Sequence, residues 1–112
     1  MSRDQQSIQD IWNAAQEILR FTSEMTRDDL AGDRRTQAAV LYEIIVIGEA
    51  ANRLSVEFRA NNPAVPWREI IGMRNILAHQ YDKIDVDVVW GAIQEDIPEL
   101  IVMLQPLLPE VD

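Results

Sequence analysis

The sequence predicts an all-α bundle of four main helices in a single domain, residues 1–112. The first reason is that apolar residues recur at the spacing of a helix face along most of the chain. The second is composition: 47% of the residues are hydrophobic and 26% are charged, while there are only four glycines and five prolines. This is the composition of a globular chain large enough for one modest core.

The first helix is expected over about residues 4–25. Its apolar face would carry Ile8, Ile11, Trp12, Ala15, Ile18, Leu19, Thr22 and Met25. Residues 26–32 are interpreted as a connection with room for a helical turn, and Gly32 or Asp33 can then cap a second long helix. The apolar stripe of that helix would carry Val40, Leu41, Ile44, Ile47, Gly48, Ala51, Leu54 and Phe58.

The second helix is apolar on two sides. Ile45 and Val46 lie off the main stripe, and a helix that is apolar on two sides is usually buried on two sides. A homodimer would explain the second side, with a thick core inside one chain as the alternative. Small residues at Gly48, Ala50 and Ala51 would also let another helix approach closely.

Proline and aspartate mark the last two helices. Pro66, which ends an Asn- and Pro-rich break, suits the first position of a third helix that runs to about Gln80. Asp85 can cap a fourth helix, in which Pro98 predicts a kink or break near Asp96. The apolar stripe of that helix would carry Val86, Val89, Trp90, Ile93, Ile97, Leu100, Ile101 and Leu104.

The net charge of −9 is spread unevenly. Residues 82–112 carry eight acids and one base, whereas residues 1–81 carry eleven acids and nine bases. Between Arg53 and Arg74 the bases outnumber the acids. Because phosphate contacts dominate nucleic-acid affinity, an acidic chain should bind RNA only through a local arginine cluster or with help from a partner. The acidic end is interpreted as a solvated face, with a basic partner as the alternative.

Residues 74–81, Arg-Asn-Ile-Leu-Ala-His-Gln-Tyr, carry the residue types that suit phosphate chemistry. His79 is the only histidine of the chain, and imidazole can move a proton near neutral pH. The Arg74 guanidinium can bind phosphate oxygens bidentately. The Tyr81 hydroxyl can donate, accept or be modified. The plainer interpretation is a histidine that stabilises a helix C-terminus and a solvated arginine.

The spacing of these residues bears on how a site could form. Asn75 and His79 share one face of a helix, but Arg74 and His79 are about 140° apart around an ideal helix. They would therefore meet only if the arginine reaches over, if the helix unwinds near His79, or if a second chain completes the site. The last option would give a homodimer a functional role.

Several kinds of protein are excluded by composition. Without cysteine there can be no disulfide or thiolate chemistry. One histidine with scattered acids lacks the spacing of metal ligands, so we expect no metal and no cofactor. No apolar run approaches the ~20 residues of a membrane span, and the N-terminus lacks the apolar core of a signal peptide. A cytoplasmic protein with no membrane association is expected.

The ordered set of motifs resembles the HepT-like toxins of the HEPN superfamily. Arg74-x4-His79-x-Tyr81 is similar to their Arg-x(4–6)-His motif with its following tyrosine. Further similarity extends over about residues 5–105 and includes the segments Gly48-Glu-Ala-Ala51, Pro66-Trp67, Ile71–His79 and Asp85…Val89-Trp90. The resemblance implies a HEPN-like bundle of four to five helices that forms a homodimer, with the motifs of both chains lining a shared cleft.

It also implies an activity and a partner. Members of this group are metal-independent endoribonucleases, toxins of a type VII-like system whose antitoxin is a nucleotidyltransferase of the MntA type. That partner would neutralise the toxin by binding it and by transferring AMP to Tyr81. The resemblance assigns catalysis to Arg74 and His79, with support from Asn75 and Tyr81.

Two other interpretations stay open. The chain could be a non-catalytic module that binds nucleotide or its partner, or a regulator of the nucleotidyltransferase with Tyr81 as substrate. Glu49 lies in a largely apolar helix and, if buried, needs a cationic partner, for which Arg74 or Arg53 is expected. A structural ion pair is favoured over a catalytic role for Glu49.

Overall fold

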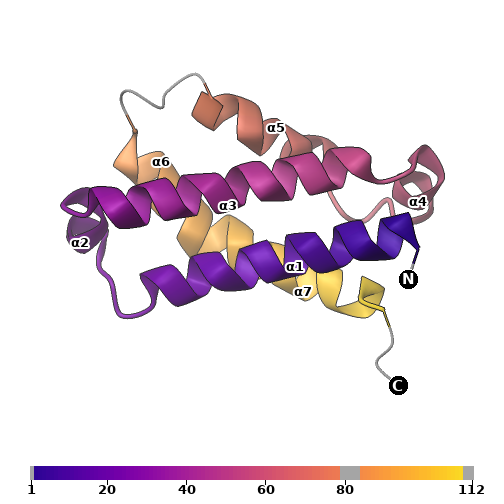
Figure 1. Cartoon of the computed structure of the whole chain (residues 1–112), viewed down its shortest axis with the longest axis horizontal. Coiled ribbons are helices and arrows are strands. Elements are labelled where there is room, and N and C mark those ends of the chain that lie inside the picture. The colour runs from indigo at the N-terminus through magenta and orange to yellow at the C-terminus, as the bar shows by residue number, and fades with distance from the viewer. Residues whose placement is uncertain (1, 79–83, 110–112) are drawn as a thin grey trace.

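The computed structural model describes residues 2–78 and 84–109, with the backbone alone for residues 75–78. The all-α prediction is confirmed, because helices account for most of these residues and no strand occurs among them. Two long antiparallel helices, α1 (Arg3–Thr22) and α3 (Arg34–Arg53), run side by side through the molecule (Figure 1).

Helix α1 begins and ends through local contacts. Ser2 caps its start in a capping box with Gln5, in which each side chain binds the other residue's backbone N–H. The helix ends at Thr22, three residues earlier than predicted, and Glu24 follows in the left-handed region with a φ of 66°. A helix cannot continue through that backbone conformation, so the predicted end at residue 25 was wrong.

The predicted helical turn in the first connection is present. Helix α2 (Arg27–Ala31) is capped by Thr26 and ends at Gly32. The amide of Gln37, on α3, donates to the carbonyls of Leu30 and Ala31 and so ties the end of α2 to α3. Asp33 caps α3 through the backbone N–H of Thr36, which confirms one of the two predicted caps.

The second predicted helix is divided in two. Helix α3 ends at Arg53, and Phe58 lies in a separate short helix, α4 (Val56–Asn61), capped by Ser55. The Asp4 carboxylate accepts hydrogen bonds from the Ser55 N–H at 2.8 Å and from its hydroxyl at 2.7 Å. These bonds favour a break at residues 54–55, so the expectation that Phe58 continues the α3 stripe was wrong.

Helix α5 (Trp67–Ala78) follows directly after Pro66, one residue later than predicted. The Pro66 carbonyl accepts from the Ile70 N–H, which starts the helical hydrogen-bond pattern. Trp67 is buried, donates from Nε1 to the Asn62 carbonyl at 3.0 Å, and packs near the Phe58 ring. It is therefore a core residue that fixes how α5 leaves the α4 connection.

The predicted irregularity before Pro98 takes the form of a π-helical turn. Asp85 caps α6 (Val86–Gly91), as predicted, and the π-helical turn Ala92–Asp96 joins it to α7 (Ile97–Leu104). A short 3₁₀ turn, Gln105–Leu107, ends the ordered helices. Because Pro98 has no N–H to donate, the backbone before it can widen at little cost.

The hydrophobic core lies between α1, α3 and the π-turn–α7 segment. Its largest fully buried side chains are isoleucine, leucine and valine, namely Ile8, Ile11, Ile18, Leu30, Val40, Ile44, Ile47, Val89, Ile93, Ile97 and Leu104. Helix α7 packs on α1, while α5 packs on the opposite flank of α3 (Figure 1). Across the described ranges, no helix is both long and apolar enough to cross a membrane.

Candidate active site

Arg74 and Glu49 meet where α5 packs on α3. The Nη1 atom of Arg74 donates to Oε1 of Glu49 at 2.8 Å, within one chain. The Arg74 side chain is 27% exposed and that of Glu49 is 51% exposed, so the pair lies at the edge of the helix contact. The predicted pairing of Glu49 with Arg74 is confirmed, and it forms at an exposed rather than a buried carboxylate. The other predicted partner, Arg53, pairs with Asp10 at 3.4 Å instead.

Gly48 explains how Arg74 comes so close to α3. A Cβ atom built on Gly48 would lie 2.9 Å from the Cβ of Arg74, closer than packed carbons approach, and 3.2 Å from its Cδ, a tight contact. A glycine inside a helix costs about 1 kcal/mol relative to alanine. Here it leaves room for the Arg74 stem to lie against the α3 backbone, which confirms the predicted close approach of another helix.

This contact restricts where the guanidinium can go. The aliphatic stem of Arg74 is held against Gly48, and one nitrogen is held by Glu49. Guanidinium has five N–H donors, so one carboxylate contact leaves several of them for another acceptor. A partly exposed, pre-oriented guanidinium is well suited to bind phosphate oxygens in a bidentate manner.

The other predicted site residues, Asn75, His79 and Tyr81, come after Arg74 in the sequence. Asn75 follows Arg74 within the helix, whose last residue is Ala78. The predicted roles of His79 and Tyr81 fall outside the described residues, as does the predicted helix end at Gln80. Of the predicted site, the described part therefore brings together Arg74 and Glu49.

The exposed face of α3 next to Glu49 is apolar. Tyr42 is 63% exposed and Ile45 is 40% exposed, and both lie on the same helix face as Glu49. Val46, the other residue off the main stripe, packs against the core as a partly buried side chain. The second apolar side of α3 is thus divided between the core and the surface beside the candidate site.

Comparison with known proteins gives a consistent family. The model of the family "Ribonuclease HepT-like" matches residues 11–107. The chain is 40% identical over 93 residues to a probable ribonuclease HepT of Thermococcus cleftensis, which covers 83% of this chain and 84% of that protein. It is 34% identical over 91 residues to a putative RNase of Methanocaldococcus jannaschii, with 81% and 84% covered.

A relative from a third organism agrees with these two. A putative RNase of Caldanaerobacter subterraneus is 38% identical over 73 residues, which are 65% of each chain. No solved structure gives a significant match. The family match begins at residue 11, inside α1, and extends to the 3₁₀ turn after α7, so it includes Gly48, Glu49 and Arg74. The chain therefore belongs to the HepT-like ribonuclease family of the HEPN superfamily.

Proposed function

We propose that this chain is the toxin of a type VII-like HepT/MntA toxin–antitoxin pair, a metal-independent endoribonuclease that acts in the cytoplasm. The observation that carries the proposal is the Arg74 guanidinium, oriented by Gly48 and Glu49, in a chain of the HepT-like family. Cleavage would occur at a site formed by Arg74, His79 and Tyr81.

The reaction needs a proton acceptor, a proton donor and a group that binds phosphate. The RNA 2′-oxygen attacks the neighbouring phosphorus as its proton passes to a base, and the bond from phosphorus to the 5′-oxygen breaks as that oxygen takes up a proton. His79 would act as the base or as the acid. Arg74 would hold the scissile phosphate and stabilise the charge that develops on its oxygens.

Glu49 would be a positioning residue rather than a catalytic one. Its carboxylate holds one nitrogen of Arg74, so the remaining donors keep a fixed direction. Asn75, one residue after Arg74 on α5, would orient the imidazole or the phosphate. Tyr81 would line the cleft and contact phosphate or base.

A homodimer would complete the site. Tyr42 and Ile45 leave an exposed apolar strip beside Glu49, which a second copy of the chain would cover. Each chain has a single histidine, so an acid–base pair of two histidines is possible only across two chains. The strip lies next to Arg74, which supports a dimer whose two sites face each other.

Inhibition would come from a nucleotidyltransferase of the MntA type that transfers AMP to Tyr81. The added phosphate would bring bulk and negative charge near Arg74. It would then compete with the RNA phosphate for the guanidinium and repel the rest of the strand.

The test is RNA cleavage by the chain purified without its partner. Total RNA and tRNA are incubated with the wild type and with His79→Ala in EDTA, after mass spectrometry has shown that Tyr81 is unmodified. We expect cleavage by the wild type and none by the variant. Absence of cleavage by unmodified wild type would overturn the nuclease and favour a non-catalytic module, an alternative that the net charge of −9 supports.

A further inference from the structure

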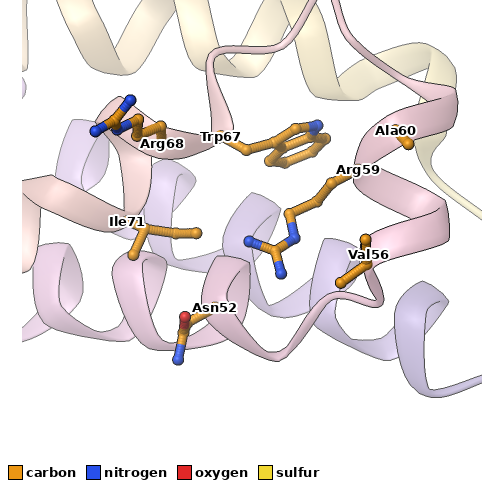
Figure 2. Close-up of a pocket in the computed structure, with 7 residues that line it drawn as sticks. All are labelled: Asn52, Val56, Arg59, Ala60, Trp67, Arg68 and Ile71. Atoms are coloured by element: carbon orange, nitrogen blue, oxygen red, sulfur yellow. The ribbon is translucent and has the colours of Figure 1, made fainter.

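A hollow of about 600 Å³ lies near the Arg74 site, where the end of α3, helix α4 and the start of α5 meet. Figure 2 shows the side chains around it, which include those of Asn52, Val56, Arg59, Trp67, Arg68 and Ile71. Asn52 lies about one helical turn after Glu49, and Ile71 about one turn before Arg74. The hollow therefore continues the α3–α5 edge that carries the candidate active site.

Arg59 reaches into this hollow and has no hydrogen-bond or ion-pair partner among the residues that the structure describes. Its side chain extends from α4 past the Trp67 indole, and its guanidinium points toward the space between Asn52 and Ile71 (Figure 2). The Nε atom of Arg59 is fully buried, and no described residue supplies a hydrogen-bond acceptor for it. A buried donor without an acceptor is costly, so a bound group that supplies an oxygen would be favoured there.

The charge around the hollow is positive. Arg68 lies at its rim, no carboxylate lines it, and neither Arg59 nor Arg68 takes part in any ion pair seen in the described residues. The two other arginines of the basic stretch, Arg53 and Arg74, are each paired with a carboxylate. The positive charge left unpaired in this stretch is thus concentrated at the hollow.

We propose that the hollow binds a phosphodiester of the RNA strand next to the one held by Arg74, an inference that rests on the proposed function. Arg59 would bind from the floor and Arg68 from the rim. Along α5, Arg68 lies about 9 Å from Arg74 and Ile71 lies about 4.5 Å from it, so one strand can follow the edge. The apolar side chains of Val56 and Ile71 would contact ribose or base.

The first experiment measures the affinity of labelled single-stranded RNA by fluorescence anisotropy, with His79→Ala as the background so that the RNA stays intact. Arg59→Met keeps the aliphatic stem, and Arg68→Gln changes an exposed side chain. Each is expected to weaken binding by about 10-fold, as for the loss of a charge-assisted hydrogen bond. Log affinity falls as log salt concentration rises, and each substitution should make this slope less negative by about 0.7.

Arg35→Gln is the matched control, because it removes the same charge from an exposed position on α3, about 25 Å along the helix from Asn52 at the hollow. Its affinity is expected to stay within about 2-fold of the background, as for an arginine without a phosphate contact. The gain in affinity on lengthening the oligonucleotide should be lost in Arg59→Met and Arg68→Gln but kept in Arg35→Gln. Thermal unfolding checks that Arg59→Met is folded, and Arg68→Gln gives an independent test if it is not.

Three results would overturn the inference. The first is unchanged affinity and salt dependence in both hollow variants, and the second is no binding of RNA by the background protein. The third is displacement of RNA by millimolar AMP or inorganic phosphate together with no effect of oligonucleotide length, which would assign the hollow to small phosphates.

The binding experiment also separates this inference from the proposed function, because binding is measured without cleavage. If the wild type cleaves RNA but Arg59→Met and Arg68→Gln bind RNA as the background does, this subsite alone is refuted. A wild type that does not cleave would refute the proposed nuclease alone, if binding still depended on Arg59.

Discussion

The contacts of helix α3 with α1 and with α5 differ in character. Toward α1, fully buried isoleucines and small residues of both helices join the core, among them Ile11 and Ile47. Toward α5, the contact uses a glycine, with the stem of Arg74 lying directly against Gly48. The first contact removes apolar surface from water, which stabilises the fold, whereas the second sets the position of one charged group.

The carboxylates on α3 show the same contrast. Glu43 is half-buried and lies near Glu17 of α1, and burial together with that like charge raises the pKa of the Glu43 carboxyl. Glu49 faces α5 and is paired with Arg74. The α1 side tolerates a small repulsion because its apolar contacts dominate, while the α5 side depends on a specific attraction. Stability and function can therefore be tested separately on one helix.

The largest effect on stability is expected on the α1 side. Ile11→Ala should lower the free energy of unfolding by about 2–5 kcal/mol, because Ile11 is fully buried and its truncation leaves a cavity. Urea denaturation measures this change. Val102→Ala is the control, since Val102 is 70% exposed and its truncation should change stability by about 0.5 kcal/mol or less. Equal effects of the two substitutions would contradict the assignment of the core.

The largest effect on activity is expected on the α5 side. Arg74→Gln should lower RNA cleavage by about 100- to 1000-fold, as for the loss of one group that stabilises transition-state charge. Its ion pair with Glu49 is partly exposed, so stability should fall by about 1 kcal/mol or less. Single-turnover cleavage and urea denaturation give the two values. A large loss of stability with little loss of cleavage would reverse the contrast between the two sides of α3.

Gly48→Ala tests whether the position of Arg74 against α3 affects RNA cleavage. Alanine favours helix, but here its Cβ would be forced against Arg74, so we expect a loss of about 1–3 kcal/mol and weaker cleavage. Gly72→Ala is the matched control inside α5, because a Cβ there meets nothing within 4 Å. It should gain up to about 1 kcal/mol from helix propensity alone. If both variants were stabilised, the close α3–α5 approach would be refuted.

The smallest effect is expected from Glu43→Gln. The pKa of Glu43 is raised in the folded protein, so its charge destabilises the fold above that pKa and the cost disappears below its ordinary pKa. The substitution should therefore stabilise the protein at neutral pH by a few tenths of a kcal/mol, since solvent screens a half-buried pair. The gain should vanish in acid. Urea midpoints measured across the pH range would contradict this if the gain grew as the pH fell.

Asp4→Asn should change the stability at neutral pH in the opposite direction to Glu43→Gln. Hydrogen bonds from the Ser55 N–H and hydroxyl lower the pKa of Asp4 in the fold. Its stabilising effect is present above its ordinary pKa and is lost as the pH falls through the lowered value. We expect the substitution to destabilise the protein at neutral pH and to have little effect in strong acid.

Local sequence patterns predicted much of the fold. The caps at Asp33 and Asp85 follow from carboxylates that accept nearby backbone N–H groups, and the turn ending at Gly32 and the irregularity before Pro98 follow from the backbone properties of those residues. The break after α3 could not be predicted in this way. It involves hydrogen bonds between Ser55 and Asp4, residues 51 positions apart in the chain, and only the folded structure brings them together.

The candidate site could likewise be predicted only in part, because some of its features depend on residues that are far apart in the chain. The small residue at Gly48 and the charge on Glu49 indicated a close helix contact and an arginine partner, and Arg74 is that partner. In the sequence, Arg59 is only one of the positive charges between Arg53 and Arg74. The role that we propose for it depends on three segments that line the hollow, and no motif within any one of them indicates that arrangement.

The most direct test of the central claim is RNA cleavage by a charge-swapped protein that carries both Glu49→Arg and Arg74→Glu. The swap keeps an ion pair between α3 and α5 but moves the guanidinium from one helix to the other. If Arg74 holds the scissile phosphate, the swapped protein should fold with near wild-type stability and show no cleavage in EDTA. Cleavage within about 10-fold of the wild type would show that the pair is only structural and would contradict the account.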